Sequence, residues 1–307
     1  MLKNSKVIRS LSAVLVLAVM DAAPSGAIDF QPFDYVPAPP KTDMLMGYYE
    51  YGTMDEVNNT ITGTTSRDTN VDSHIGILRY LHYNEVFDRP YLLQVLLPFG
   101  GFHNDKIDGT RLNEQGGMGD PIISAVFWPV ADKESRRYLS ISSYLSLPLG
   151  TYDERRALNL GANRWQHDLQ VDFNQGFLGR FTIDIAGDWI HYGDNKDAGP
   201  EHAKLTENSS YNVYGWLSYD VSEAVRAVMP SASNASISVG YAGTYGGKQR
   251  LNGIYDGSET VEHQIRLTYM EMFAPTWQGL LSLNHDTGVS GEFKQEFGIV
   301  LRVTKIF

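Results

Sequence analysis

Charged side chains recur at alternate positions in two neighbouring segments of the chain, residues 165–174 and 179–191. Asp168 and Asp172 alternate with apolar residues in the first segment, and Arg180, Asp184 and Asp188 do so in the second. Successive side chains of an extended chain point to opposite faces of a sheet, so these charges share a face that requires water. Two kinds of chemistry fit: an acidic wall that favours cations or guides polar groups, and a set of ion pairs that stiffens a narrow interior.

The same phase places further charged residues on this face. If it lines a lumen, the pore-lining candidates are Asp168, Asp172, Arg180, Asp184, Asp188, Arg266, Lys294, Glu296 and Arg302. We expect the two segments to pair as antiparallel neighbours, with Asp172 opposite Arg180 and Asp168 opposite Asp184. A register slip of two would change these pairs but keep them inside. In the ion-pair interpretation, the arginines and Lys294 are the partners of the aspartates.

Catalytic and metal-binding motifs are not indicated. The chain has no cysteine, which excludes thiol nucleophiles, thiolate metal sites and disulfides. None of its eight histidines has serine two residues further on, and neither G-x-S-x-G nor H-E-x-x-H occurs. The aspartate-rich stretches HNDKIDGT and GDNKD lack the EF-hand pattern. We predict no enzyme activity, no cofactor and no metal site; the rival hypothesis, a hydrolase, requires a Ser–His pair within hydrogen-bond reach.

Alternating segments of this kind repeat along the chain, with turn residues between them and no convincing helical periodicity. The predicted strands are 44–51, 71–83, 89–98, 119–129, 137–147, 164–174, 179–191, 211–221, 236–246, 260–273, 277–286 and 292–307. The 71–83 segment is less regular, because Arg79 falls among its apolar positions, and this predicts a bulge or a different phase there. Asn159, Gly161 and Asn163 fit either a tight turn or a loop folded inward as a constriction.

Many of these strands are longer than those of soluble sheets, and aromatic residues such as Trp165, Trp189 and Trp277 stand near their ends. Long and short connections largely alternate, with one exception near residues 221–235. Both features are typical of outer-membrane barrels, in which the apolar face contacts lipid and the charged face is wet. We therefore predict an all-β fold, a transmembrane up-and-down antiparallel barrel of about twelve strands. A barrel of this size suits a pore that is narrow, or blocked by an inward loop or by the N-terminal segment.

The two ends of the chain predict export and assembly. Residues 1–27 have a basic start, a short apolar run and small residues before a cleavage point, which predicts a signal peptide. Residues 28–43 are rich in proline and predict an extended segment before a barrel over 44–307. The last strand ends on Phe307, with Val303, Leu301 and Ile299 on the same face, and resembles the C-terminal assembly signal of bacterial outer-membrane proteins. The expected partners are outer-membrane lipid and the barrel assembly machinery, whereas the net charge of −11 argues against nucleic acid.

Several motifs, in their order along the chain, resemble one family. They are FDYVPAPPKTDMLMGYYEY, GGMGDP, SLPLGTYD, and NLGANRW followed by GDN, and the resemblance covers roughly residues 33–307. The family is the outer-membrane transporter family named for the meta-pathway of phenol degradation. The resemblance implies a Gram-negative outer-membrane barrel for passive uptake of small molecules, often aromatic or apolar, with no catalytic residues. The alternatives are a structural, loop-displaying barrel without transport and an outer-membrane hydrolase.

Overall fold

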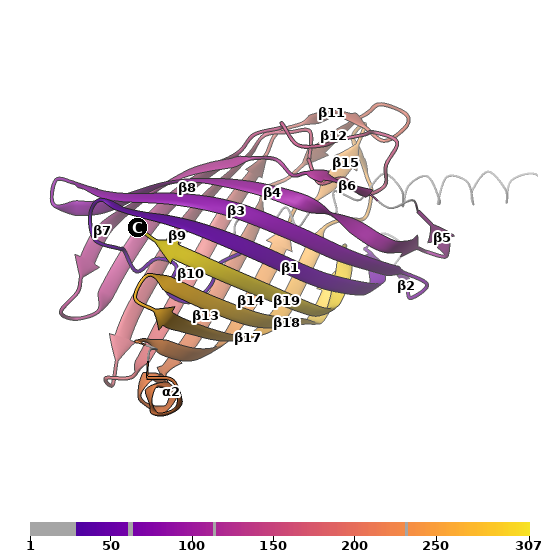
Figure 1. Ribbon diagram of the computed structural model, residues 1–307. Coiled ribbons are helices and arrows are strands. Elements are labelled where there is room, and N and C mark those ends of the chain that lie inside the picture. The colour runs from indigo at the N-terminus through magenta and orange to yellow at the C-terminus, as the bar shows by residue number, and fades with distance from the viewer. Residues whose placement is uncertain (1–28, 61–63, 113–114, 231–232) are drawn as a thin grey trace, which may run out of the picture.

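The computed structural model describes residues 29–60, 64–112, 115–230 and 233–307, so the predicted signal peptide lies outside the described residues. Twelve antiparallel strands form a closed barrel (Figure 1), because the last strand pairs with the first from Met44 opposite Ile306 to Val57 opposite Phe293. These strands are β1 (Thr42–Asn59), β3 (Asn70–Val86), β4 (Arg89–Ile107), β7 (Ile122–Asp132), β8 (Arg137–Ser146), β9 (Gln166–Phe177), β10 (Phe181–Tyr192), β13 (Ser210–Asp220), β14 (Ala235–Gly246), β17 (Thr260–Ala274), β18 (Trp277–Ser290) and β19 (Phe293–Ile306). The predicted fold class is confirmed.

The smaller elements gather at the ends of the barrel. At the long-loop end, β2 (Thr64–Ser66) pairs with β1, and β5 (Thr110–Arg111) and β6 (Gln115–Met118) pair with β4. There β11 (Asn195–Ala198), β12 (Ala203–Glu207), β15 (Gln249–Leu251) and β16 (Ile254–Tyr255) make a separate four-stranded sheet (Figure 1). The short turns, the C-terminus and α2 (Ser222–Val228) lie at the other end. Helix α2 occupies the connection that the alternation of loop lengths left unexplained. No helix among the described residues has the length and apolar character that a membrane crossing requires.

Burial follows the predicted alternation on most strands. On β9, Leu169, Val171 and Phe173 are exposed on the outside, while Asp168 and Asp172 at alternate positions are buried in the lumen. An exposed apolar wall over a buried polar face is the pattern of a barrel in lipid. The outward set continues on β19, where Leu301, Val303 and Phe307 are exposed and Ile299 is partly so. Their role in assembly stays a prediction.

The pairing of β9 with β10 differs from the predicted register. Phe177 lies opposite Phe181, which places Asp172 opposite Ala186 and Asp168 opposite Ile190. The predicted pairs were wrong because β9 continues to Phe177, three residues beyond its predicted end. Arg180 therefore lies in the turn rather than in the lumen, where its exposed guanidinium forms an ion pair with Glu223 of α2.

A bulge between β1 and β19 changes the phase of two other candidates. The register shifts between Thr53 and Glu56 of β1. As a result the side chain of Gln295 lies beside Gly52 and Gly298. Lys294 instead pairs with Glu56 and Glu296, each at 3.2 Å, on the side of the bulge nearest the long loops. Simple alternation had placed Lys294 and Glu296 on the lumen face. A bulge inserts one residue and inverts the phase beyond it.

Candidate functional site in the barrel lumen

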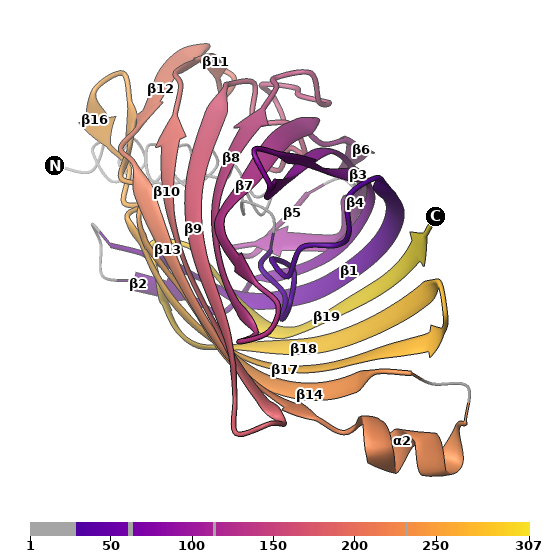
Figure 2. The same ribbon diagram turned by 90° about the vertical axis from the view of Figure 1, so that its left-hand side faces the viewer.

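The segment before β1 runs inside the barrel, and residues 29–40 are called the plug here. Figure 2 shows this segment within the ring of strands. Pro32, Pro37, Pro39 and Pro40 have no N–H to donate to a β-ladder, so the segment does not join the wall. It makes turns instead, with the N–H of Asp34 donating to the carbonyl of Gln31 and that of Val36 to the carbonyl of Phe33.

Aromatic side chains of the wall anchor the plug at two places, on β7 and β13, which three other strands separate. The indole Nε1 of Trp216 on β13 donates to the carbonyl of Phe30 at 3.2 Å, and that of Trp128 on β7 donates to the carbonyl of Tyr35 at 2.8 Å. The rings of Phe30 and Tyr35 stack at 5.6 Å, and the Tyr35 hydroxyl contacts that of Tyr144 on β8. Phe30 and Tyr35 are 1% and 2% exposed, which is the burial of a protein core.

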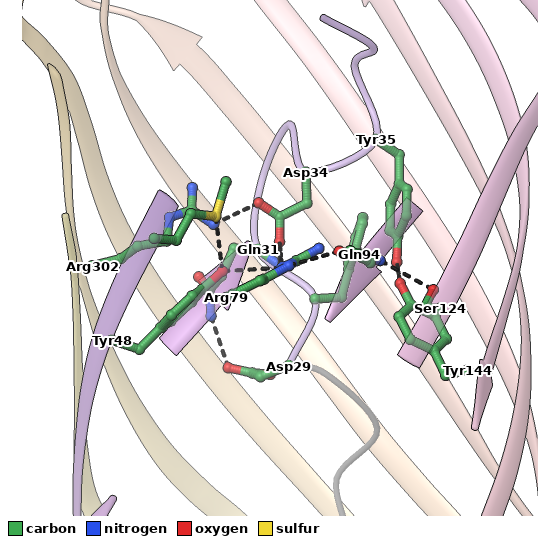
Figure 3. A network of polar contacts seen from close by, with 12 residues as sticks. Asp29, Gln31, Asp34, Tyr35, Tyr48, Arg79, Gln94, Ser124, Tyr144 and Arg302 are labelled. Atoms are coloured by element: carbon green, nitrogen blue, oxygen red, sulfur yellow. Dashed lines mark hydrogen bonds and ion pairs between the residues drawn. The ribbon is translucent and has the colours of Figure 1, made fainter. Parts of the chain in front are cut away.

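Buried ion pairs fix the plug further (Figure 3). Arg302 on β19 donates from Nη1 to Asp34 Oδ1 at 2.6 Å, and the Nη1 of Arg79 lies 4.0 Å from Asp34 Oδ2. Arg79 also donates to Gln94 at 2.8 Å and to the Tyr48 hydroxyl at 3.0 Å. The guanidinium of Arg266 on β17 forms a second ion pair, with Asp29. Thus the basic residues of the wall neutralise acidic residues of the plug.

Arg79 was the irregularity in its predicted strand, and of the two explanations the different phase was right: Arg79 and its apolar neighbours Leu81 and Tyr83 are buried inside, while Leu78 and Tyr80 are exposed. The pairings of Arg79 with Met46 and Leu96 are continuous, without a bulge, and the residue faces the lumen. The inner face of β3 carries Leu81 and Tyr83 because the plug covers it, so apolar residues occupy both faces. The sequence signal was real: a charge among apolar positions marked the place where the plug docks.

The loop between β8 and β9 also folds inward, which is the second of the two hypotheses for residues 159–163. Leu158 and Leu160 pack in a buried cluster with Val71, Ile75 and Phe102 of the wall. The Asp120 carboxylate accepts from the N–H groups of Gly150 and Ala162, both at 2.8 Å. Within the loop, hydrogen bonds from Arg155 hold the pKa of Asp153 below its usual value, so this carboxylate stays ionised.

Between the plug and the long loops lies a cavity of about 580 Å³, called the chamber here. Its floor includes Asp29, and its wall carries Arg266 together with carboxylates, amides and a few apolar side chains. The carboxylates are Asp29, Glu50, Asp108, Glu207, Glu262, Asp286 and Glu292. Lys294 and Glu296 are not among the lining residues. The chamber therefore favours hydrogen-bond donors and cations over anions.

The predicted lumen aspartates form an acidic face on β9 and β10, comprising Asp168, Asp172, Asp184 and Asp188. All four are buried, from 0% to 4% exposed. Asn174 donates to Asp184, and Asn212 donates to Asp188 at 3.4 Å. In the described part of the chain none of the four forms an ion pair, because Arg266 and Arg302 are engaged with the plug. The interpretation as mutually compensating wall pairs does not describe this face.

One Ser–His pair lies on the outer wall near the long-loop end. The Ser143 hydroxyl on β8 is 2.9 Å from Nε2 of His167 on β9. The backbone around the pair is engaged in the ladders with neighbouring strands. Among the described residues no carboxylate forms an ion pair with the His167 ring, and no group of three acidic or histidine residues is arranged to hold a metal.

The family model described as "Putative MetA-pathway of phenol degradation" matches residues 54–303. An outer membrane channel from Pseudomonas putida F1 is similar over 91% of this chain and 100% of its own, with 29% identity and a TM-score of 0.83. The β-domain of the Bordetella autotransporter BrkA, at 6% identity and a TM-score of 0.52 over 87% of this chain and 100% of its own, shares the fold alone. No curated protein matches the chain.

Proposed function

The chain belongs to the family of the MetA-pathway of phenol degradation and forms an outer-membrane channel barrel, and from this we propose that it is a passive small-molecule channel closed at rest by its plug. The observation that carries the proposal is the docking of the plug by two indole donors and two sets of ion pairs across the lumen. A barrel of twelve strands is wider than one filled by its own side chains. A segment that fills this wider lumen suits a channel that opens for particular solutes better than a general diffusion pore that is always open.

The chamber suggests the class of solute. Its volume falls within the usual range of small-ligand sites, about 300–1,000 Å³. Carboxylates and amides offer acceptors, while Tyr214, Ile190 and Phe293 offer apolar surface. We propose small aromatic compounds that carry hydrogen-bond donors, which also agrees with the phenol in the family's description. Phenolic solutes should then interrupt the current of an open channel more often than sugars of similar size.

Reversible locking of the plug tests this function. The chain has no cysteine, so Tyr35→Cys and Tyr144→Cys introduce a unique pair where two hydroxyls now touch. A reducible bifunctional maleimide that spans the lost phenol rings should hold the plug in place. In planar bilayers we expect little current through the cross-linked protein, and discrete ohmic steps after the linker is cleaved, when the plug, which then lacks its Tyr35–Tyr144 contact, can leave the lumen.

Each single-cysteine variant, treated identically, is the control for loss of the tyrosine. An equal current before and after cleavage would contradict a gating plug. Silence in both states, in a correctly folded barrel, would favour the structural barrel without transport.

The Ser143–His167 pair supports a second candidate function, acyl-ester hydrolysis at the lipid interface. A hydroxyl beside an imidazole is the minimum of an activated nucleophile. The hydrogen bond has a structural explanation as well, because it satisfies two polar groups that face lipid. No carboxylate of the described chain orients the imidazole ring as in a catalytic triad, so we place this function second. We expect ester hydrolysis by the refolded protein to match that of Ser143→Ala within error. A loss of hydrolysis in Ser143→Ala, with Ser146→Ala unaffected, would establish the enzyme.

A further inference from the structure

The acidic face of β9 and β10 has more acceptors than the described protein satisfies. Both carboxylate oxygens of Asp168 and of Asp172 lack a hydrogen-bond partner, although these residues are 4% and 0% exposed. One oxygen of Asp184 and one of Asp188 are in the same condition. A buried ionised carboxylate without a partner is costly, since neither water nor a countercharge stabilises it.

The neighbouring strand extends this set of oxygens. Ser140 on β8 lies opposite Asp172, and Ser142 lies opposite Gln170 of β9. The hydroxyls of both serines and Oε1 of Gln170 are buried and without a hydrogen-bond partner in the described part of the chain. The lumen face of three adjacent strands thus presents carboxylate, hydroxyl and amide oxygens together. Oxygen ligands of this kind suit hard cations such as Mg²⁺ and Ca²⁺.

No positive side chain of the described residues neutralises the acidic face while the plug is docked. Arg302 and Arg79 face Asp34, and Arg266 pairs with Asp29, so the plug takes the basic residues of the lumen. The plug also adds its own two carboxylates opposite the acidic face. Docking the plug therefore increases the need for cations along β9 and β10.

We propose that this face binds hard divalent cations, with Mg²⁺ as the reference ion, between the barrel wall and the plug. The aspartates alternate along two strands rather than converging, and no three acidic or histidine residues of the described chain form a compact cage. Each ion therefore keeps several waters and contacts one or two carboxylates, as Mg²⁺ commonly does. This inference deepens the proposed function, because the ions occupy the passage that the plug closes.

Calorimetric titration of MgCl₂ into the refolded, chelator-treated full barrel tests the site directly. We expect saturable binding by the wild type and a Kd raised about tenfold or more in Asp168→Asn/Asp172→Asn. The matched control, Glu154→Gln/Glu201→Gln, removes the same charge from residues outside the acidic face and should bind as the wild type does. Heat-modifiable migration on gels confirms that each variant is folded.

Thermal midpoints give an independent readout. Without divalent ions the Asp168→Asn/Asp172→Asn variant should be more stable than the wild type, and added MgCl₂ should stabilise only the wild type and the control. Choline chloride at equal ionic strength should not reproduce the shift. Equal shifts with both salts, or an Mg²⁺ response retained by the double variant, would overturn the site. Because binding is measured without current, failure of the channel hypothesis leaves this result interpretable.

Discussion

Deleting residues 29–36 is expected to raise single-channel conductance by about tenfold or more, because a twelve-stranded barrel freed of its filling approaches a water-filled pore. The deletion removes both backbone carbonyls held by Trp128 and Trp216 and both acidic partners of the wall arginines. The barrel itself should persist, since its ladders close through β1 and β19 without the plug. Current recordings in planar bilayers, together with gel migration before and after heating, measure both effects.

The matched control for the deletion is Pro39→Ala/Pro40→Ala, which alters the exposed end of the plug and keeps every anchor. It should retain the wild-type current. If the deletion leaves the current unchanged, the closure lies elsewhere, and the inward loop that carries Leu158 and Leu160 becomes the first place to look.

Replacing Arg302 with Met is expected to release the plug without unfolding the barrel. Removing one partner of a buried ion pair costs about 3–5 kcal/mol, because the other charge stays buried and unpaired. The carboxylate left behind is that of Asp34, which keeps the Nη1 of Arg79 at 4.0 Å and a hydrogen bond from the backbone N–H of Gln31 at 3.3 Å. If this cost falls on the docked state, the ratio of open to docked protein rises by roughly two to four powers of ten. The open probability of single channels measures it.

A double-mutant cycle separates this ion pair from general damage to the wall. Asp34→Asn in the Arg302→Met background removes the orphaned charge and should restore much of the closed time. Arg302→Lys keeps the charge but not the planar geometry, so its open probability should lie between those of the wild type and Arg302→Met. Strictly additive effects of Asp34→Asn and Arg302→Met would show that the pair does not hold the plug.

The strands and the membrane-facing surface followed from the sequence alone. Alternation is a local property, because two successive residues of any extended chain point to opposite faces. It therefore identified the twelve strands, the lipid face of residues such as Leu169 and Val171, and the lumen face of Asp168, Asp172, Asp184 and Asp188. The residue composition likewise predicted the turn after β3 and the extended, proline-rich segment before the barrel.

Register and closure were decided only by the tertiary structure. The position of Arg180 depended on where the β9–β10 hairpin turns, and those of Lys294 and Glu296 on one bulge, neither of which alternation determines. The partners of Arg266 and Arg302 are 237 and 268 residues away in sequence, on a segment that has no periodicity of its own. The sequence determines which side chains of a strand share a face, because that is set by neighbouring residues. Which charges meet in the lumen is set by barrel closure and by the docking of the plug, and both join distant parts of the chain.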